Sequence, residues 1–218
     1  MIRRYTTSCH TIAALFAVLL FAASARADTV SYNFFVDTSG IAALSPAGGW
    51  LDFEFNQANA LDSLSAIATI TNFTSTGYTF GPTVQTSAGV TGLLPGPIAI
   101  PNDQGAANFF TQEVTAWGGS FAFEVTLSGP AVGTAAPDGS AFYAYLLDPG
   151  FNQIVSPSTS TGEILNVTID SAGGTTPQAT AFTGGSSTAI PEPGAAWLAL
   201  TALALLAIGR LRSGRSEA

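Results

Sequence analysis

The stretch SFAFEVTL, residues 120–127, decides the fold class of this 218-residue chain. Its large apolar side chains occupy every second position: Phe121, Phe123, Val125 and Leu127. Because successive side chains of a β-strand point to opposite sides, this alternation predicts a strand with one face in a core and the other in water.

The same alternation recurs on both sides of this stretch. TVSYNFFV (29–36) and WLDFEF (50–55) show it most clearly. Four further ranges are predicted strands: 64–73, 107–115, 141–147 and 163–170. Turn motifs rich in glycine, proline and aspartate separate the strands, and no range between 28 and 170 keeps a 3.6-residue period. We therefore predict an all-β fold for residues 28–170, either a single antiparallel β-sandwich or a related barrel.

Residues 28–189 carry charge of one sign. They contain eight Asp and four Glu but no Lys, Arg, His or Cys, which gives a formal charge of −12. Such a surface repels nucleic-acid phosphates, so no nucleic-acid partner is expected. The missing residue types also exclude catalytic triads, Schiff-base lysines and zinc sites built from His or Cys. We expect a protein that is not an enzyme and has no cofactor.

Carboxylate chemistry stays open as an alternative. A glycosidase would draw its paired acids from the four glutamates of this region: Glu54, Glu113, Glu124 and Glu163. Their alternation within strands is equally typical of the water-facing side of a sheet.

A calcium ion could bind the oxygen-rich segments DPGFN (148–152) or PNDQG (101–105), but neither matches the D-x-D-x-D-G spacing, and such segments are usually turns. The metal-ligating residues, if any, stay unassigned.

Carbohydrate binding without catalysis is a second alternative. Trp50 and Trp117 could stack on sugar rings from a rigid sheet face, and an extracellular polysaccharide would then be a partner. Both rings could equally fill the core, where buried indoles are common.

The N-terminal 27 residues are predicted to be a signal peptide. Two arginines precede an apolar run that is too short to cross a bilayer. Ala25 and Ala27 then provide the small residues that a signal peptidase recognises, so that Asp28 would begin the mature chain.

The C-terminal segment changes composition twice. Residues 171–189 are rich in Gly, Ser, Thr, Ala and Pro and are predicted to form a flexible stalk. Residues 195–209 are apolar on all sides of the helix that they would form, which predicts a transmembrane helix of about 22 Å, short for a bilayer core of about 30 Å. The arginines that follow should keep the C-terminus cytoplasmic. They are Arg210, Arg212 and Arg215.

Between stalk and helix stands Pro191-Glu192-Pro193, which the prolines hold extended. This triplet, an apolar helix and a basic end within residues 190–215 together resemble the PEP-CTERM sorting signal of Gram-negative bacteria, a tail that is also labelled as an ice-binding protein C-terminal domain. The segments GWLDFEFN (49–56) and SFAFEVTLSGP (120–130) are similar to those of a recurrent set of PEP-CTERM proteins of unknown activity.

The resemblance implies a route and a set of partners. The chain would cross the inner membrane, be cut by signal peptidase, and stay anchored transiently by its C-terminal helix. An exosortase would then recognise the Pro-Glu-Pro triplet and deliver the domain to the cell surface or the extracellular matrix of a biofilm. We expect a structural or adhesive component of that layer.

Overall fold

The stretch 120–127 lies in strand β8 (Ser120–Ser128), and its odd positions are buried while its even positions are partly exposed, as the alternation predicts. Phe121, Phe123, Val125 and Leu127 are buried, while the residues between them are partly exposed. The structure is a computed structural model that describes residues 29–59, 63–102, 107–154, 163–179 and 189–190. Within these ranges the chain is all-β, with a single four-residue helix, α2 (Ile41–Leu44).

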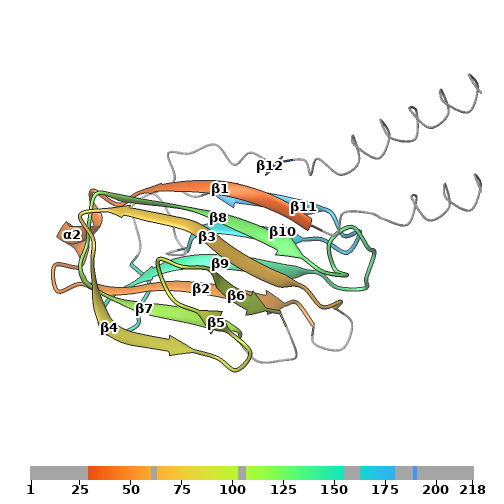
Figure 1. Cartoon of the computed structure of the whole chain (residues 1–218), viewed down its shortest axis with the longest axis horizontal. Coiled ribbons are helices and arrows are strands. Elements are labelled where there is room, and N and C mark those ends of the chain that lie inside the picture. The colour runs from red at the N-terminus through yellow and green to blue at the C-terminus, as the bar shows by residue number, and fades with distance from the viewer. Residues whose placement is uncertain (1–28, 60–62, 103–106, 155–162, 180–188, 191–218) are drawn as a thin grey trace, which may run out of the picture. The chain divides into compact units, whose positions relative to one another are not determined.

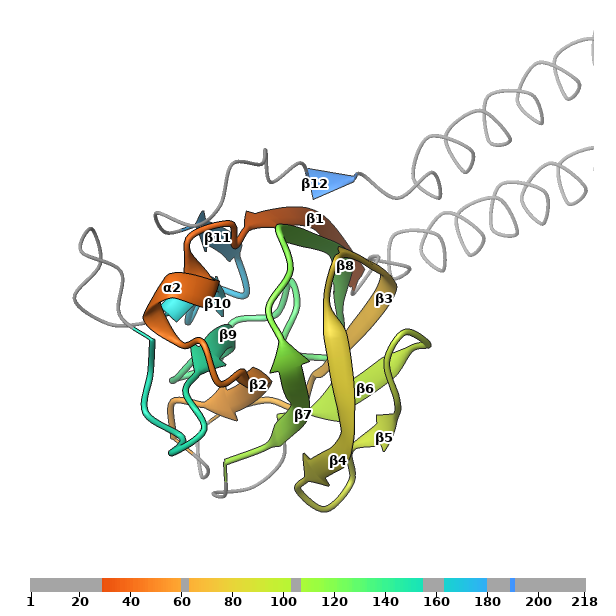
Figure 2. The same ribbon diagram turned by 90° about the vertical axis from the view of Figure 1, so that its left-hand side faces the viewer.

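The strands form two antiparallel sheets (Figure 1). Sheet A contains, in spatial order, β12 (Ala189–Ile190), β1 (Thr29–Asp37), β8, β3 (Ile67–Thr76), β6 (Ile98–Pro101) and β5 (Thr91–Gly92). Sheet B contains β11 (Thr175–Ala179), β10 (Glu163–Ile169), β9 (Ser140–Leu147), β2 (Gly49–Gln57), β7 (Phe109–Ala116) and β4 (Thr79–Thr86). The view in Figure 2 shows β1, β8 and β3 on one side and β9, β2 and β7 on the other.

Aromatic rings from the two sheets meet in the core. Phe53 of β2 contacts Phe123 of β8 with ring centroids 5.2 Å apart and an interplanar angle of 63°. Phe53 also stacks on Phe142 of the neighbouring strand β9 at 6.1 Å. Phe53 and Phe142 are fully buried, and Phe123 is nearly so. The inward side of each sheet is therefore occupied by its apolar alternate positions, which leaves the other side for polar residues.

A buried asparagine joins the two sheets beside this core. Asn102 follows β6 and is 1% exposed. Its Oδ1 accepts the backbone N–H of Ala66 at 2.7 Å, and its Nδ2 donates to the Leu64 carbonyl at 2.9 Å and to Ser140 Oγ on β9 at 2.8 Å. Because each polar atom of the amide has a partner, the burial of Asn102 is compensated.

The seven strands predicted from alternation are all present, and five further strands were not predicted. The strand predicted at 64–73 lies three residues later, as β3. The unpredicted strands are β4, β5, β6, β11 and β12. β4 contains Gly81 and Pro82, and β11 contains Pro177, residues that are unusual inside a strand. Both lie at an edge of sheet B, where a proline removes no ladder hydrogen bond to a second neighbour.

The ordered domain continues beyond residue 170. Strand β11 lies inside the range 171–189 that the composition predicts as a stalk, and it pairs with β10 from Ile169↔Thr175 to Leu165↔Ala179. Residues 180–188 of that range lie outside the described residues. So do the predicted signal peptide with its cleavage residues, the Pro-Glu-Pro triplet, the apolar helix at 195–209 and the arginines after it. Within the described ranges, no helix has the length and hydropathy needed to cross a membrane.

Candidate functional site

The outer face of sheet B brings together residues from three neighbouring strands. The strand register places Asp52 of β2 beside Tyr145 of β9, which in turn lies beside Glu163 of β10. Two residues along, Glu54 lies beside Tyr143, which lies beside Asn166. In each row a tyrosine therefore lies between an acid of β2 and a polar residue of β10.

The two tyrosines form a stacked pair on this face. The ring centroids of Tyr143 and Tyr145 are 5.9 Å apart, with an interplanar angle of 23°. Both side chains are partly exposed, whereas Phe142, Ala144 and Leu146 on the other side of β9 are buried. We name this surface the tyrosine face; it comprises Asp52, Glu54, Asn56, Tyr143, Tyr145, Glu163 and Asn166.

Asp52 is the most buried group of the tyrosine face, at 5% exposure. Its Oδ1 accepts a 2.5 Å hydrogen bond from Thr111 Oγ1 on β7. Burial raises the pKa of Asp52 to about 7, and the negative charge of Glu54 and a hydrogen bond with its carboxyl act in the same direction, against the lowering effect of Thr111. Asp52 therefore titrates near neutral pH, with its carboxyl shielded from solvent.

The tyrosine hydroxyls keep their protons. Burial raises the pKa of both phenols, and the charges of Glu54 and Glu163 raise it further. Each hydroxyl can thus donate a hydrogen bond, while carboxylates beside it can accept one. The face combines flat apolar rings with donors and acceptors at their edges, an arrangement that suits a ligand with both apolar faces and polar substituents.

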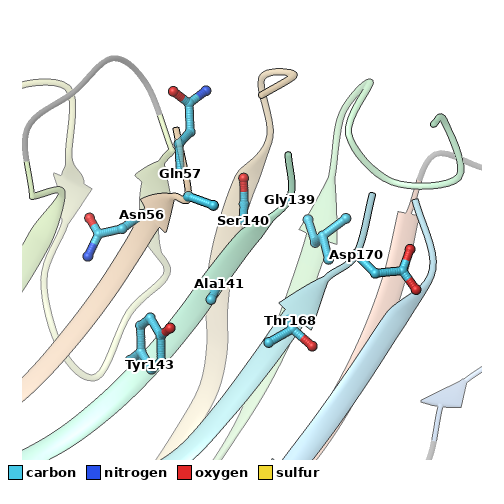
Figure 3. A pocket seen from close by; sticks show the side chains of 10 residues that line it. Asn56, Gln57, Gly139, Ser140, Ala141, Tyr143, Thr168 and Asp170 are labelled. Atoms are coloured by element: carbon cyan, nitrogen blue, oxygen red, sulfur yellow. The ribbon is translucent and has the colours of Figure 1, made fainter. Parts of the chain in front are cut away.

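A hollow of about 300 Å³ lies at one end of the tyrosine face (Figure 3). Its floor includes Ala141, whose small side chain stands between Asn56 of β2 and Thr168 of β10, with Tyr143 beside it. Asp170, at the edge of the hollow, accepts backbone N–H groups of Ala172 and Gly174 through Oδ1. The hollow has the size of a small-molecule site, and it is open to solvent.

A second hollow of about 130 Å³ lies at the other end of β2 and is lined by Trp50, Glu113 and Pro149, among others. Trp50 is partly exposed and stacks on Phe151, with centroids 4.7 Å apart and an interplanar angle of 16°. Phe151 is 47% exposed and has a φ of 62°, an unfavourable backbone conformation for an aromatic residue. Trp50 is thus on the surface of sheet B, with one ring face covered by Phe151.

Trp117 has a different environment, which agrees with the second interpretation of this residue, a place in the core. It is 9% exposed and packs edge-on against Tyr78, with ring centroids 5.9 Å apart. Its ring belongs to the core and presents no face to a ligand. Of the two tryptophans considered from the sequence, only Trp50 lies at the surface.

The four candidate glutamates do not gather in one place. Glu54 and Glu163 both belong to the tyrosine face. Glu113 extends over Gly81 of β4 and accepts the backbone N–H of Thr83 at 3.1 Å, a contact within the irregular part of that strand. Glu124 lies on sheet A and accepts a hydrogen bond from Asn72 at 2.9 Å.

Of the two calcium candidates, the segment 148–152 is described in full, and the segment 101–105 is described only at Pro101 and Asn102. Asp148 Oδ1 accepts the N–H groups of Gly150 and Asn152, and these hydrogen bonds, those of Asn152 first, lower the pKa of the Asp148 carboxyl. In the other segment Asn102 is the bridging amide of the core, and residues 103–105 lie outside the described ranges. Among the described residues, no group of three or more His, Cys, Asp or Glu side chains could hold a metal ion.

The sequence reasoning missed Asp52, Tyr143 and Tyr145 as site residues. The signal for the tyrosines was present in AFYAYLL (141–147), where they occupy alternate positions of a predicted strand. What the sequence lacked was the order of strands in the sheet, which sets these rings between β2 and β10.

No family model matches this chain, and neither a curated protein nor a solved structure matches it.

Proposed function

We propose that the protein is an exported, exosortase-processed component of the cell surface or exopolymer layer, and that it binds polysaccharide through the tyrosine face. The observation that carries the binding role is the stacked pair Tyr143 and Tyr145 beside a hollow of about 300 Å³. Aromatic rings on a rigid sheet can pack against the apolar faces of sugar rings, while adjacent carboxylates and hydroxyls bond their substituents.

The domain that presents this face is a β-sandwich in our proposal. Two observations support a sandwich over a barrel: the two sheets share no strand, and Phe53 of one contacts Phe123 of the other. A sandwich suits an adhesive role because its outer faces are held rigidly and stay free for ligands.

We propose binding and no catalysis. A paired-acid glycosidase needs an acid that reaches the substrate. Asp52, whose raised pKa would suit a general acid, is 5% exposed, and its Oδ1 is bonded to Thr111. Glu54 has partial exposure but accepts an amide hydrogen bond from Asn56 at 2.9 Å.

A retention assay tests the binding role. The full chain, in a polyoxyethylene detergent that carries no sugar, is passed over a panel of immobilised polysaccharides, and new reducing ends are measured in parallel. Tyr143→Leu keeps an apolar side chain but removes the ring, and we expect it to weaken retention about tenfold. Phe35→Leu is the matched control, because Phe35 is a 44% exposed ring on β1 of sheet A. Equal loss in both variants, or release of sugar by the wild type, contradicts the proposal.

The sorting route is tested separately. Replacing Pro191-Glu192-Pro193 with three alanines should leave the chain untrimmed and in the membrane fraction of a host that has an exosortase. Replacing Arg210, Arg212 and Arg215 with glutamine should impair the cytoplasmic orientation of the C-terminus. Processing and distribution like those of the wild type in the alanine variant would overturn the proposed route.

A further inference from the structure

The tyrosine face carries negative charge and belongs to a part of the chain without basic residues. Residues 28–189 contain no Lys, Arg or His. The carboxylates of the face are therefore stabilised by neutral donors, as where Asn56 donates to Glu54 and Asn166 donates to Glu163 at 2.5 Å. A ligand that brings positive charge to this surface would be attracted by these carboxylates.

We propose that the ligand of the tyrosine face is an amine-bearing polysaccharide, a linear polymer of 2-amino sugars of which many lack the N-acetyl group. This inference rests on the proposed polysaccharide binding and specifies the class of sugar. An ammonium group beside Glu54 and Glu163 gains electrostatic attraction, and over a tyrosine ring it gains a cation–π contact. A neutral sugar would displace water from the same carboxylates but would bring no positive charge to compensate for the lost hydration.

The geometry favours an extended chain over a single sugar. The two hollows lie at opposite ends of β2, one lined by Asn56 and Gln57 and the other by Gly49 and Trp50. The tyrosine pair and the acids of β2 lie between them in the strand register. The seven residues from Trp50 to Asn56 span about 20 Å of strand, so several consecutive sugar units can contact the face at once.

The test compares two oligosaccharides of equal length that differ only in N-acetylation. The full chain in polyoxyethylene detergent is titrated with a glucosamine oligomer and with its fully N-acetylated form at about pH 6, where a free amine is protonated. We expect the glucosamine oligomer to bind at least about tenfold more tightly. Glu54→Gln should reduce that preference about fivefold or more, and Glu124→Gln, which removes the same charge from sheet A, should leave it unchanged.

The outcomes separate this inference from the proposed function. Equal affinity for both oligomers overturns the amine inference, while polysaccharide binding stands. Failure of both oligomers and of every polysaccharide in the retention panel overturns the proposed function itself. Polylysine is tested as a cationic polymer without sugar rings. If it binds as tightly as the glucosamine oligomer, and Tyr143→Leu weakens the binding of neither polymer, then the face attracts cations in general and the inference is wrong. Thermal unfolding of each variant establishes that a lost affinity is not a lost fold.

Discussion

Replacing Asp52 with asparagine should change how the stability of the fold depends on pH. Asp52 is 5% exposed, and its pKa is raised to about 7 chiefly by burial, with Glu54 adding to the effect. Asparagine has the same shape and carries no charge. Its Oδ1 can accept the hydrogen bond from Thr111 Oγ1, and its Nδ2 can donate to Glu54, so the local structure should be kept.

The sign follows from the proton count in the two states. An unfolded Asp loses its proton near pH 3.8, whereas the folded protein keeps the Asp52 proton up to about pH 7. Between these values the folded state binds more protons, so the contribution of Asp52 to the free energy of unfolding is greatest below the unfolded pKa and is lost as the pH rises through the folded one. At about 1.4 kcal/mol for each pH unit, the loss reaches at most about 4 kcal/mol.

Urea denaturation of the wild type and the variant at a series of pH values measures the effect. We expect the Asp52→Asn variant to be close to the wild type at about pH 4 and more stable by about 2 to 4 kcal/mol at about pH 8. The difference between the two curves isolates Asp52, because the exposed carboxyls of Asp37 and Asp148 contribute equally to both. Glu124→Gln on sheet A serves as the control for removing a charge and should leave the wild-type pH dependence in place. If the curves of the wild type and Asp52→Asn stay parallel between about pH 4 and 8, Asp52 is not the buried titrating group that we infer.

Three further predictions concern the core, the bridge between the sheets and the turn after β9. Asn102→Ala should lower the free energy of unfolding by about 3 kcal/mol because it leaves buried partners unbonded, whereas Asn33→Ala on an exposed position of β1 should stay within about 0.5 kcal/mol, as measured by urea denaturation. Phe53→Ala should cost about 3 to 5 kcal/mol by the same assay, and a cost equal to that of Phe35→Ala would refute its central place between the sheets. The melting temperature should be the same in calcium and in EDTA because Asp148 already accepts several N–H groups, and a rise in calcium would reveal a bound ion.

Most of the fold was predictable because apolar alternation is strong wherever a strand has one buried side. β8 and β2 show this in the sequence and in the structure. Strands that lie at an edge have a weaker requirement for burial, so β4 and β11 accept proline and leave no clear pattern. β5 and β12 have two residues each, too few for any period to be visible.

The candidate site was less predictable because it depends on which strands are neighbours. Alternation correctly assigns Glu54 and Glu124 to outer faces, but it gives no information about the sheet to which each strand belongs. The two glutamates lie on different sheets. It also does not tell that Asp52 is covered. An even position of β2 should face water, and Asp52 is buried on that side because the larger Tyr145 and Thr111 lie directly beside it in the register.

The position of Asp52 also bears on which surface binds a ligand. A buried carboxyl next to a second one weakens the fold when it ionises, and an asparagine at the same position would satisfy Thr111 without that cost. Local conflicts of this kind are expected where function constrains the sequence. The outer face of sheet A shows the opposite pattern, since Ser31 and Thr126 simply bond each other across two strands at 2.7 Å. The conflict and the stacked tyrosines occur together on sheet B, and this coincidence supports the proposal that the tyrosine face binds a ligand.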